Sequence, residues 1–417
     1  MSAIAATLAP EVVDAELPSS PPPAAALTAP APQPRDRAHL AYLDGLRAVA
    51  ALYVVLHHAW MIATIAPGTG PVAKFSKILL ERGHVAVDLF IVLSGFCLMI
   101  PVARRSGELQ GGAISFFKRR ARRILPPYFF AMVLSLLAIV TVLGVRTGTL
   151  WDDCIALTPA GIVTHVLLIH ELFYGTAQQI NNVFWSVAVE WKIYFLFPLL
   201  VIACRRWGAL IMTVLAIVLS YVLLIGLRPT PINAHTGGVS AHYIGLFAMG
   251  MLAAQVAFAR SGRYAQVRER WPWTALLIVV TVITIAASKV PLAHENLTPF
   301  NDFFVGIWSM ALLVTLAARE RGMLRRMLSW APLAFLGTFA YSIYLIHLPL
   351  LQFFWQYLLM PRGLSFTQTL AAMCAVAAPI TVGLSYLFFF AFERPFLSTG
   401  ARRAPSELNP SCAALPA

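Results

Sequence analysis

Residues 40–61 read LAYLDGLRAVAALYVVLHHAWM, and this stretch decides the class of fold. It is long and apolar enough to cross a bilayer as a helix, because about 20 apolar residues span the hydrocarbon core. It also carries Asp44, Arg47, His57 and His58. A charged side chain at the bilayer centre costs about 2.5–3.5 kcal/mol on insertion scales. Polar side chains that remain in a span despite this insertion cost indicate either side chains that reach the membrane–water interface or a functional site.

Helical periodicity assigns these polar residues to different faces. At about 100° per residue, eleven steps make almost whole turns, so Arg47 and His58 lie on one stripe of the helix. The guanidinium and the imidazole then stand about 16 Å apart along the axis. His57 is rotated about 100° from His58, so the two imidazoles cannot share that stripe. The spacing therefore favours His58 over His57 as the partner of Arg47.

The composition is that of a polytopic helical membrane protein. Of 417 residues, 59% are hydrophobic and 12% are charged, and the mean hydropathy is +0.74. Soluble domains are far less apolar. The net charge of +13 does not indicate nucleic acid, because the basic residues stand in short loops between apolar runs, where they set orientation in the lipid bilayer. The five cysteines are scattered, so neither a disulfide framework nor a metal site is expected.

Loop charges predict the topology. A run at 161–173 is short for a span. If it does not cross, twenty Lys or Arg residues lie on one side and seven on the other, which satisfies the positive-inside rule. The sequence thus predicts an all-α protein with both termini cytoplasmic, 161–173 as a half-buried or re-entrant segment, and ten spanning helices. These are expected near residues 40–62, 84–101, 124–144, 183–203, 209–227, 242–259, 272–289, 303–318, 331–355 and 368–392.

The two ends of the chain differ from the rest. Residues 1–38 are rich in Ala and Pro and lack both a basic start and a continuous apolar core. That composition predicts a disordered cytoplasmic extension and not a signal peptide. Residues 398–417 are polar and are expected to be a flexible tail. The transmembrane domain is therefore predicted to cover residues 39–397.

The second apolar run begins GHVAVDLFIVLSGF at Gly83 and places His84 and Asp88 four residues apart. A carboxylate in a span needs a partner, and Arg47 or His58 is the natural candidate. A purely structural ion pair is the alternative interpretation.

The segment FFKRRARRILPPYF (116–129) places five basic residues before an apolar helix. Positive-inside anchoring accounts for such a cluster. So does a cradle for a phosphorylated ligand, because guanidinium groups match phosphate oxygens bidentately. Arg120 and Arg123 lie on one helix face and are the best candidates for the second role, with Arg119 beside them.

Two later segments also interrupt apolar helices with polar residues. In NNVFWSVAVEWKIYF (181–195), Glu190 and Tyr194 share a face, so Glu190 is expected to point inward. In FLGTFAYSIYLIHLPL (335–350) the polar members are Tyr341, Ser342, Tyr344 and His347. His347 fits a core histidine bonded to a backbone carbonyl as well as a functional one. Glu393, in FERPF (392–396), is expected to organise the basic loops.

Taken in order, six of these motifs resemble the type-3 family of integral membrane O-acyltransferases, which acylates bacterial surface glycans and some natural products. The resemblance covers residues 40–396, and Ala86 replaces a glycine that is usual in the family. The matching features are Arg47 with His58, the VDLFIVLSGF segment, F-x-x-R-R-x-x-R-I-x-P-x-Y (116–128), N-x-x-W-S-x-x-x-E (182–190), F-L-G-x-x-x-Y-S-I-Y-L-x-H-x-P (335–349) and E-R-P (393–395).

The resemblance implies acyl transfer from an acyl-CoA, most often acetyl-CoA, to a hydroxyl of a sugar, in the bacterial cytoplasmic (inner) membrane. No permanently bound cofactor is expected. The donor phosphates would meet Arg120, Arg123 and Arg119. His58 would act as the general base, or carry the acyl group transiently, in an environment set by Asp88 or Glu190. Arg47 would orient the donor or stabilise charge near the thioester.

The chain ends soon after the last apolar run, so no fused SGNH-type domain is expected, and the transfer is either completed in the membrane or handed to a separate transferase. Two other function classes compete. In a glycan, lipid or small-molecule transporter or flippase, the buried His, Asp and Arg residues would form a relay, although no internal repeat is visible. A non-catalytic partner of a biosynthetic complex would leave Arg47 and His58 without a purpose.

Overall fold

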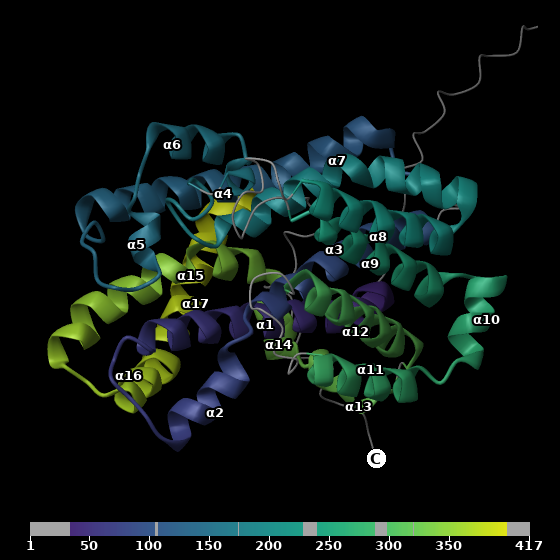
Figure 1. The fold of residues 1–417 in the computed structure, drawn as a ribbon. Coiled ribbons are helices and arrows are strands. Elements are labelled where there is room, and N and C mark those ends of the chain that lie inside the picture. Colours follow the sequence, from purple (N-terminus) through teal and green to yellow (C-terminus); the bar gives the residue numbers. More distant parts are fainter. Residues whose placement is uncertain are drawn as a thin grey trace, which may run out of the picture.

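The computed structural model describes residues 34–104, 107–173, 175–227, 240–287, 298–319 and 321–397 (Figure 1). Within these ranges every regular element is helical, so the predicted all-α polytopic membrane fold is confirmed. Helix α1 begins at Pro34, a few residues before the predicted start of the domain. Residues 1–33 of the predicted extension and the tail 398–417 lie outside the described residues.

The α-helices have the following bounds: α1 Pro34–Ala63, α2 Pro71–Leu80, α3 His84–Arg104, α4 Gly112–Thr141, α5 Trp151–Cys154, α6 Pro159–Val166, α7 Phe184–Trp207, α8 Ala209–Gly226, α9 His242–Phe258, α10 Arg263–Arg270, α11 Trp273–Ala287, α12 Thr298–Ala318, α13 Met323–Leu328, α14 Ala331–Thr338, α15 Ala340–Phe354, α16 Phe366–Ala372 and α17 Ala378–Phe388.

Eight helical stretches among the described residues are long and apolar enough to cross a membrane, and two of them join a short helix to a longer one, α2 to α3 and α16 to α17. Helix α9, which meets α10 at a bend of 83°, makes a ninth if the pair counts as one span. Helix α11 is apolar but shorter, at 15 described residues. Ten spans were predicted, so α11 is the one whose described length falls short. The segment 161–173 forms only the end of α6 and a turn at His170–Leu172, and neither element is long enough to span.

The apolar run 331–355 is not one helix, as the sequence predicted, but two. Helices α14 and α15 are separated at Phe339, whose backbone angles (φ −123°, ψ 22°) are not helical. Just before the break, α14 packs closely on α1, since a Cβ at Gly337 would stand 1.8 Å from the carbonyl oxygen of Asp44. The break turns the two halves in different directions and leaves Thr338 on the wall of an internal cavity.

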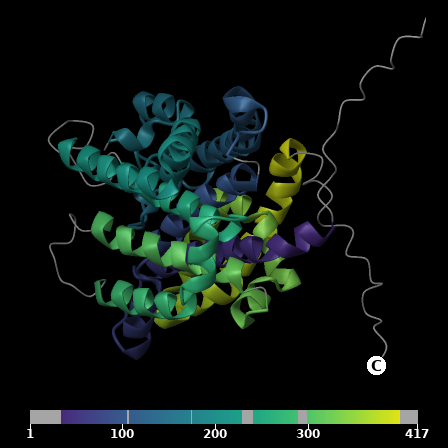
Figure 2. The same cartoon turned by 90° about the vertical axis from the view of Figure 1, so that its right-hand side faces the viewer.

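Helices α1, α3 and α14 lie at the centre of the bundle (Figure 1). Helix α3 packs along α9 at backbone contact, because Gly95 faces the carbonyl of Phe247 and Gly250 faces that of Val92. Small residues let membrane helices approach in this way. Figure 2 shows the bundle turned by 90°, with the start of α1 (purple) near its right-hand edge.

Two sides of the molecule follow from the direction of α1. The end that carries Arg47 defines the Arg47 side, where α10 lies, and the end that carries His58 defines the His58 side, where α2 and α16 lie (Figure 1). Helix α3 returns from the His58 side, since it begins at His84 after the connection through α2.

Candidate active site

A cavity of about 270 Å³ opens between α1, α3, α4, α7, α14 and α15. Its walls combine apolar side chains with three guanidinium groups and two carboxyl groups. Such a mixture is typical of a ligand site, where a few polar groups fix the orientation of a molecule held mainly by apolar contact. The polar residues on its walls are Arg47, Ser94, Arg120, Arg123, Ser186, Glu190, Tyr194, Thr338, Tyr341, Tyr344 and Glu393.

Arg47 reaches the cavity from α1 and is held by two neighbours. One guanidinium nitrogen is paired with Asp44, one turn earlier on the same helix. The other donates to the sulfur of Cys97 on α3 at 3.0 Å. The Arg47 end of the predicted stripe on α1 therefore faces the cavity, and the guanidinium is fixed at the cavity wall.

The basic cluster of α4 divides between the cavity and the surface. Arg120 and Arg123 line the cavity, as their shared helix face predicted. Arg119 does not line it and donates to the carbonyl of Gln110 at 2.8 Å in an exposed position. The Nε of Arg120 is buried without a hydrogen-bond partner among the described residues. Two cations thus face the cavity from α4, and one of them retains unused hydrogen-bonding capacity.

The two carboxyl groups on the cavity wall are each held by a hydroxyl. Tyr194 donates to Oε1 of Glu190 at 2.5 Å, which confirms that these two residues share a face. Ser94 lies 3.0 Å from the Tyr194 hydroxyl. Ser342 donates to Oε2 of Glu393 at 2.5 Å.

Glu393, which was expected to organise the basic loops, shares the cavity wall with Arg123 of the basic segment. Its residue is 1% exposed, and it lines the cavity. The turn Phe389–Glu393 continues α17 and brings Glu393 to the cavity. Its partner Ser342 is fully buried behind it and does not itself line the cavity.

His58 lies against His347, which approaches from α15. Nε2 of His347 is 3.0 Å from Nδ1 of His58. Nδ1 of His347 is 2.7 Å from the carbonyl of Tyr344, and because a carbonyl only accepts, this Nδ1 carries the proton of a neutral imidazole. Nε2 of His347 is then an acceptor. The predicted bond from His347 to a backbone carbonyl is confirmed, and the contact with His58 is an additional one.

The same reasoning fixes the tautomer of His58. Its Nδ1 faces two acceptors, Nε2 of His347 and the carbonyl of Val54, each at 3.0 Å. Nδ1 must therefore carry the proton, which leaves the lone pair on Nε2. His58 is partly buried and lies outside the walls of the cavity. A lone pair on one ring nitrogen is what a general base requires.

Tyr344 connects the histidine pair to the cavity. Its ring lines the cavity and lies 5.9 Å, centroid to centroid, from the ring of His347. Its hydroxyl donates to the carbonyl of Val183 at 3.0 Å and is 2.6 Å from the hydroxyl of Ser186. The start of α7 thus positions Tyr344. Ser186 was quoted only as part of a motif, and no pattern in the sequence shows that it meets α15.

His57 faces another direction, as the periodicity predicted. Its Nδ1 donates to the carbonyl of Leu80 at 2.6 Å. A Cβ at Gly83 would stand 2.2 Å from the imidazole, so the ring lies tight against the loop before α3. His57 therefore holds that loop and has no contact with His347 comparable to that of His58.

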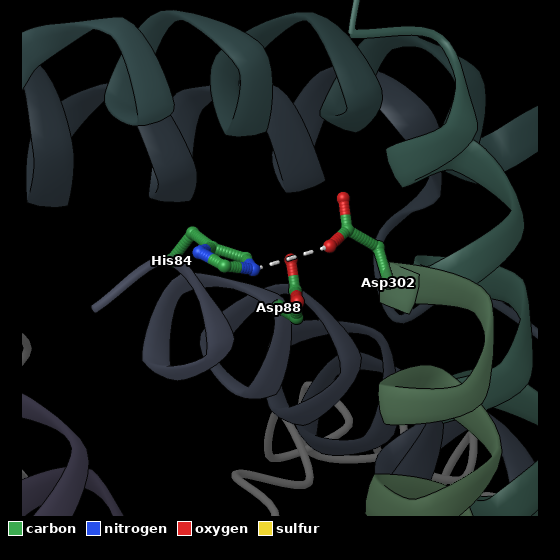
Figure 3. A group of neighbouring side chains, drawn as sticks. All are labelled: His84, Asp88 and Asp302. Atoms are coloured by element: carbon green, nitrogen blue, oxygen red, sulfur yellow. Dashed lines mark ion pairs between the residues drawn. The ribbon is translucent and has the colours of Figure 1, made fainter. Parts of the chain in front are cut away.

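Asp88 pairs with neither Arg47 nor His58, and the expected partnership is not formed. It lies with His84 and Asp302, the latter on α12 (Figure 3). Arg47 is instead paired with Asp44. The reason is that Asp88 points from α3 toward α9 and α12, on the face away from α1. Nothing in the local sequence around Asp302 indicated this meeting, because it depends on how three helices pack.

Comparison with known proteins adds the family. The acyltransferase-domain family matches residues 40–390. Among curated proteins, nodulation protein 10 of Rhizobium leguminosarum bv. viciae is 26% identical over 74% of this chain and 82% of its own length. The peptidoglycan O-acetyltransferase OatA of Listeria monocytogenes is 25% identical over 76% of this chain, which spans 50% of that relative's length. No solved structure matches.

The family match covers most of the chain, the histidine pair and every residue of the cavity wall except Glu393. It agrees with the order of motifs in the sequence and favours an enzyme over a transporter. The chain therefore belongs to the type-3 family of integral membrane O-acyltransferases, and its activity is acyl transfer.

Proposed function

We propose that this enzyme moves an acyl group, most often acetyl, from acyl-CoA to a hydroxyl group of a carbohydrate or glycosylated acceptor. The observation that carries the proposal is the connection, through Tyr344, between an arginine-lined cavity and a histidine with a free Nε2. A cationic site and a base joined in this way suit a donor that bears phosphates at one end and a thioester at the other.

The donor binds with its phosphates at Arg120 and Arg123, whose guanidinium groups can each hold phosphate oxygens through two parallel hydrogen bonds. Its acyl-carrying arm then runs along the cavity past Tyr344 toward the histidine pair. Arg47 and His58 are about 16 Å apart along α1. They cannot both touch the reacting carbonyl, so of its two expected functions Arg47 has that of orienting the donor.

His58 acts as the general base. Its Nε2 takes the proton of the acceptor hydroxyl while the hydroxyl oxygen attacks the thioester carbonyl. The carbon–sulfur bond breaks, the oxygen–acyl bond forms, and the coenzyme A thiolate leaves with the proton that the imidazole returns. His347 holds His58 in the tautomer that this step requires.

One relative supports the acceptor class, since it is named a peptidoglycan O-acetyltransferase and acts, by that name, on a cell-wall glycan.

The positive-inside distribution of loop charges supports an orientation in which the Arg47 side faces the cytoplasm, where acyl-CoA is present. The His58 side then faces outward, toward a surface glycan or a separate transferase that receives the acyl group.

The test is thiol release from acetyl-CoA by purified protein in nanodiscs, with and without a peptidoglycan-derived glycan mixture. We expect acceptor-dependent release that falls about 10²- to 10⁴-fold in His58→Ala, the usual contribution of a general base. His57→Ala is the matched control, and it should retain most of the activity. Equal losses in both variants would contradict the assignment of the base.

Mass spectrometry of the protein after incubation with acetyl-CoA alone distinguishes the base from an acyl carrier. A base leaves His58 unmodified, whereas a carrier adds one acetyl group to it. If wild-type protein neither binds nor consumes any acyl-CoA, the proposed donor is wrong.

A further inference from the structure

A second polar cluster lies apart from the cavity, where α3, α9 and α12 begin. His84 and Asp88 come from the first turns of α3, Asp302 comes from α12, and His242 comes from α9. The ligand atoms of His84, Asp88 and Asp302 all lie within 4.8 Å of one another. Figure 3 shows these three side chains pointing toward a common centre.

The carboxylates of this cluster lack the partners that buried charges require. Asp88 and Asp302 are each 0% exposed. Neither oxygen of Asp88, nor Oδ1 of Asp302, has a hydrogen-bond partner among the described residues. The Tyr243 hydroxyl and the Asp302 carboxyl both lie near Asp88, but neither is in hydrogen-bonding geometry to its oxygens. Buried carboxylates are normally paired, hydrogen-bonded or bound to a metal.

Neither neighbouring imidazole bonds the unpartnered oxygens, because Nε2 of His242 faces Oδ2 of Asp302 at 2.9 Å and His84 is too far away. Nε2 of His84 stands 3.8 Å from Oδ1 of Asp302, which exceeds hydrogen-bonding distance. Even a protonated His84 balances only one of two negative charges. A divalent cation at the common centre balances both, and its bonds use the very oxygens that are left without partners.

We propose that Asp88, Asp302 and His84 bind a divalent transition-metal cation of the Zn²⁺ class. Imidazole together with carboxylate is a ligand set that such ions accept, whereas Mg²⁺ and Ca²⁺ prefer oxygen ligands alone. Ligand atoms on one such ion stand about 3–4 Å apart, so small side-chain rotations bring the three groups into range. The inference does not depend on the proposed acyl transfer.

His242 serves as the orienting neighbour of this site. Its Nε2 is 2.9 Å from Oδ2 of Asp302, and because a carboxylate oxygen only accepts, this nitrogen donates to it and holds that oxygen while Oδ1 stays free for the metal. Second-layer hydrogen bonds of this kind are common around metal ligands. Access is through His84, whose side chain is 33% exposed, while both carboxylates are enclosed.

The site offers three protein ligands and an access path. A fourth position is thus left for a further ligand, as in zinc sites that hold three protein groups and a water. The bound ion also ties α3 to α12 at the point where both begin, and through His242 it stabilises α9. The carboxylates would otherwise destabilise this helix junction.

The test measures metal content and not activity. Full-length protein in detergent is loaded with Zn²⁺ and desalted, and bound zinc is measured by mass spectrometry. We expect about one Zn²⁺ per chain. His84→Gln and Asp302→Asn should lose it, His242→Gln should bind about 10- to 100-fold more weakly, and Asp153→Asn, an exposed aspartate away from the cluster, should bind like wild type.

Co²⁺ substitution supplies a spectroscopic readout. Visible absorption bands of bound Co²⁺ should appear in the wild type and in Asp153→Asn and be absent in His84→Gln, a variant at a partly exposed position that is expected to fold. The proposal is overturned if the wild type retains no Zn²⁺ or Co²⁺, if Mg²⁺ displaces them at equal concentration, or if His84→Gln and Asp302→Asn bind as tightly as the wild type.

Discussion

The cavity and the carboxylate cluster are both polar regions inside an apolar bundle, but they balance their charges differently. In the cavity, each carboxyl group accepts from a hydroxyl, and Arg47 is paired with Asp44. In the cluster, Asp88 has no hydrogen bond at all among the described residues. The cavity is thus largely satisfied by its own chain, with spare capacity only on its arginines, while the cluster lacks a cation.

This difference indicates which charge of ligand each region accepts. Spare donors on arginine, beside satisfied carboxylates, call for an anion, and phosphate is the anion that guanidinium groups match best. Spare acceptors on two enclosed carboxylates require a cation. The same helix, α3, serves both regions, since Ser94 and Cys97 face the cavity while Asp88 faces the cluster. Helix α3 therefore lies between two sites, one that suits an anion and one that suits a cation.

The largest effect is expected from the double variant Arg120→Ala/Arg123→Ala. Each charged hydrogen bond contributes about 1.5–3 kcal/mol, so acetyl-CoA should bind about 10²- to 10⁴-fold more weakly. Isothermal titration of the protein with acetyl-CoA measures this, and Arg119→Ala, whose guanidinium bonds Gln110 outside the cavity, is the control. If Arg119→Ala weakens the donor as much, the cavity is not the anion site.

A smaller effect is expected at His347. His347→Ala leaves Nδ1 of His58 with only the Val54 carbonyl and frees the ring to reorient, so kcat should fall about 10- to 100-fold with little change in KM, as for other orienting residues. His347→Gln keeps an acceptor and should recover part of the rate. The zinc content of both variants should equal that of the wild type. A parallel loss of zinc would mean that the cavity and the cluster are coupled.

Gly250→Ala tests the helix pair that carries the cluster. Its Cβ would lie 1.9 Å from the carbonyl oxygen of Val92, and such overpacking destabilises by about 1–3 kcal/mol. The Tm of the purified protein should therefore fall by several degrees. Gly383→Ala on α17, where no atom lies within 4 Å of the added carbon, is the control and should leave Tm unchanged or slightly higher, because alanine favours helix.

The smallest effect is expected in the way Tm changes with pH. It tests a buried histidine that lies outside both the cavity and the cluster. Burial lowers the pKa of His165, on the short helix α6, to about 4. The unfolded chain then binds more protons than the folded one between pH 6.5 and 4, so this group makes stability fall as the pH falls through that range. His165→Gln should make the Tm less dependent on pH there. An unchanged dependence would assign the acid response to other groups, such as the cluster.

Much of the fold could be predicted from the sequence. Length and hydropathy fix which segments are helices, because a backbone in lipid must satisfy its own hydrogen bonds. The break at Phe339 was not predicted, and the close contact of Gly337 with Asp44 beside it depends on how α14 packs on α1. The short helix α2 was also not predicted, although its ten residues are amphipathic.

For the candidate site, the sequence by itself determined the pairs that share one helix. Arg47 with His58, Arg120 with Arg123 and Glu190 with Tyr194 follow from 3.6 residues per turn. Only the tertiary structure decided which helices meet. It brought His347 to His58, Ser186 to Tyr344 and Asp302 to Asp88. These pairs are separated by about a hundred or more residues, so no local period connects them, and their contacts depend on the packing of whole helices.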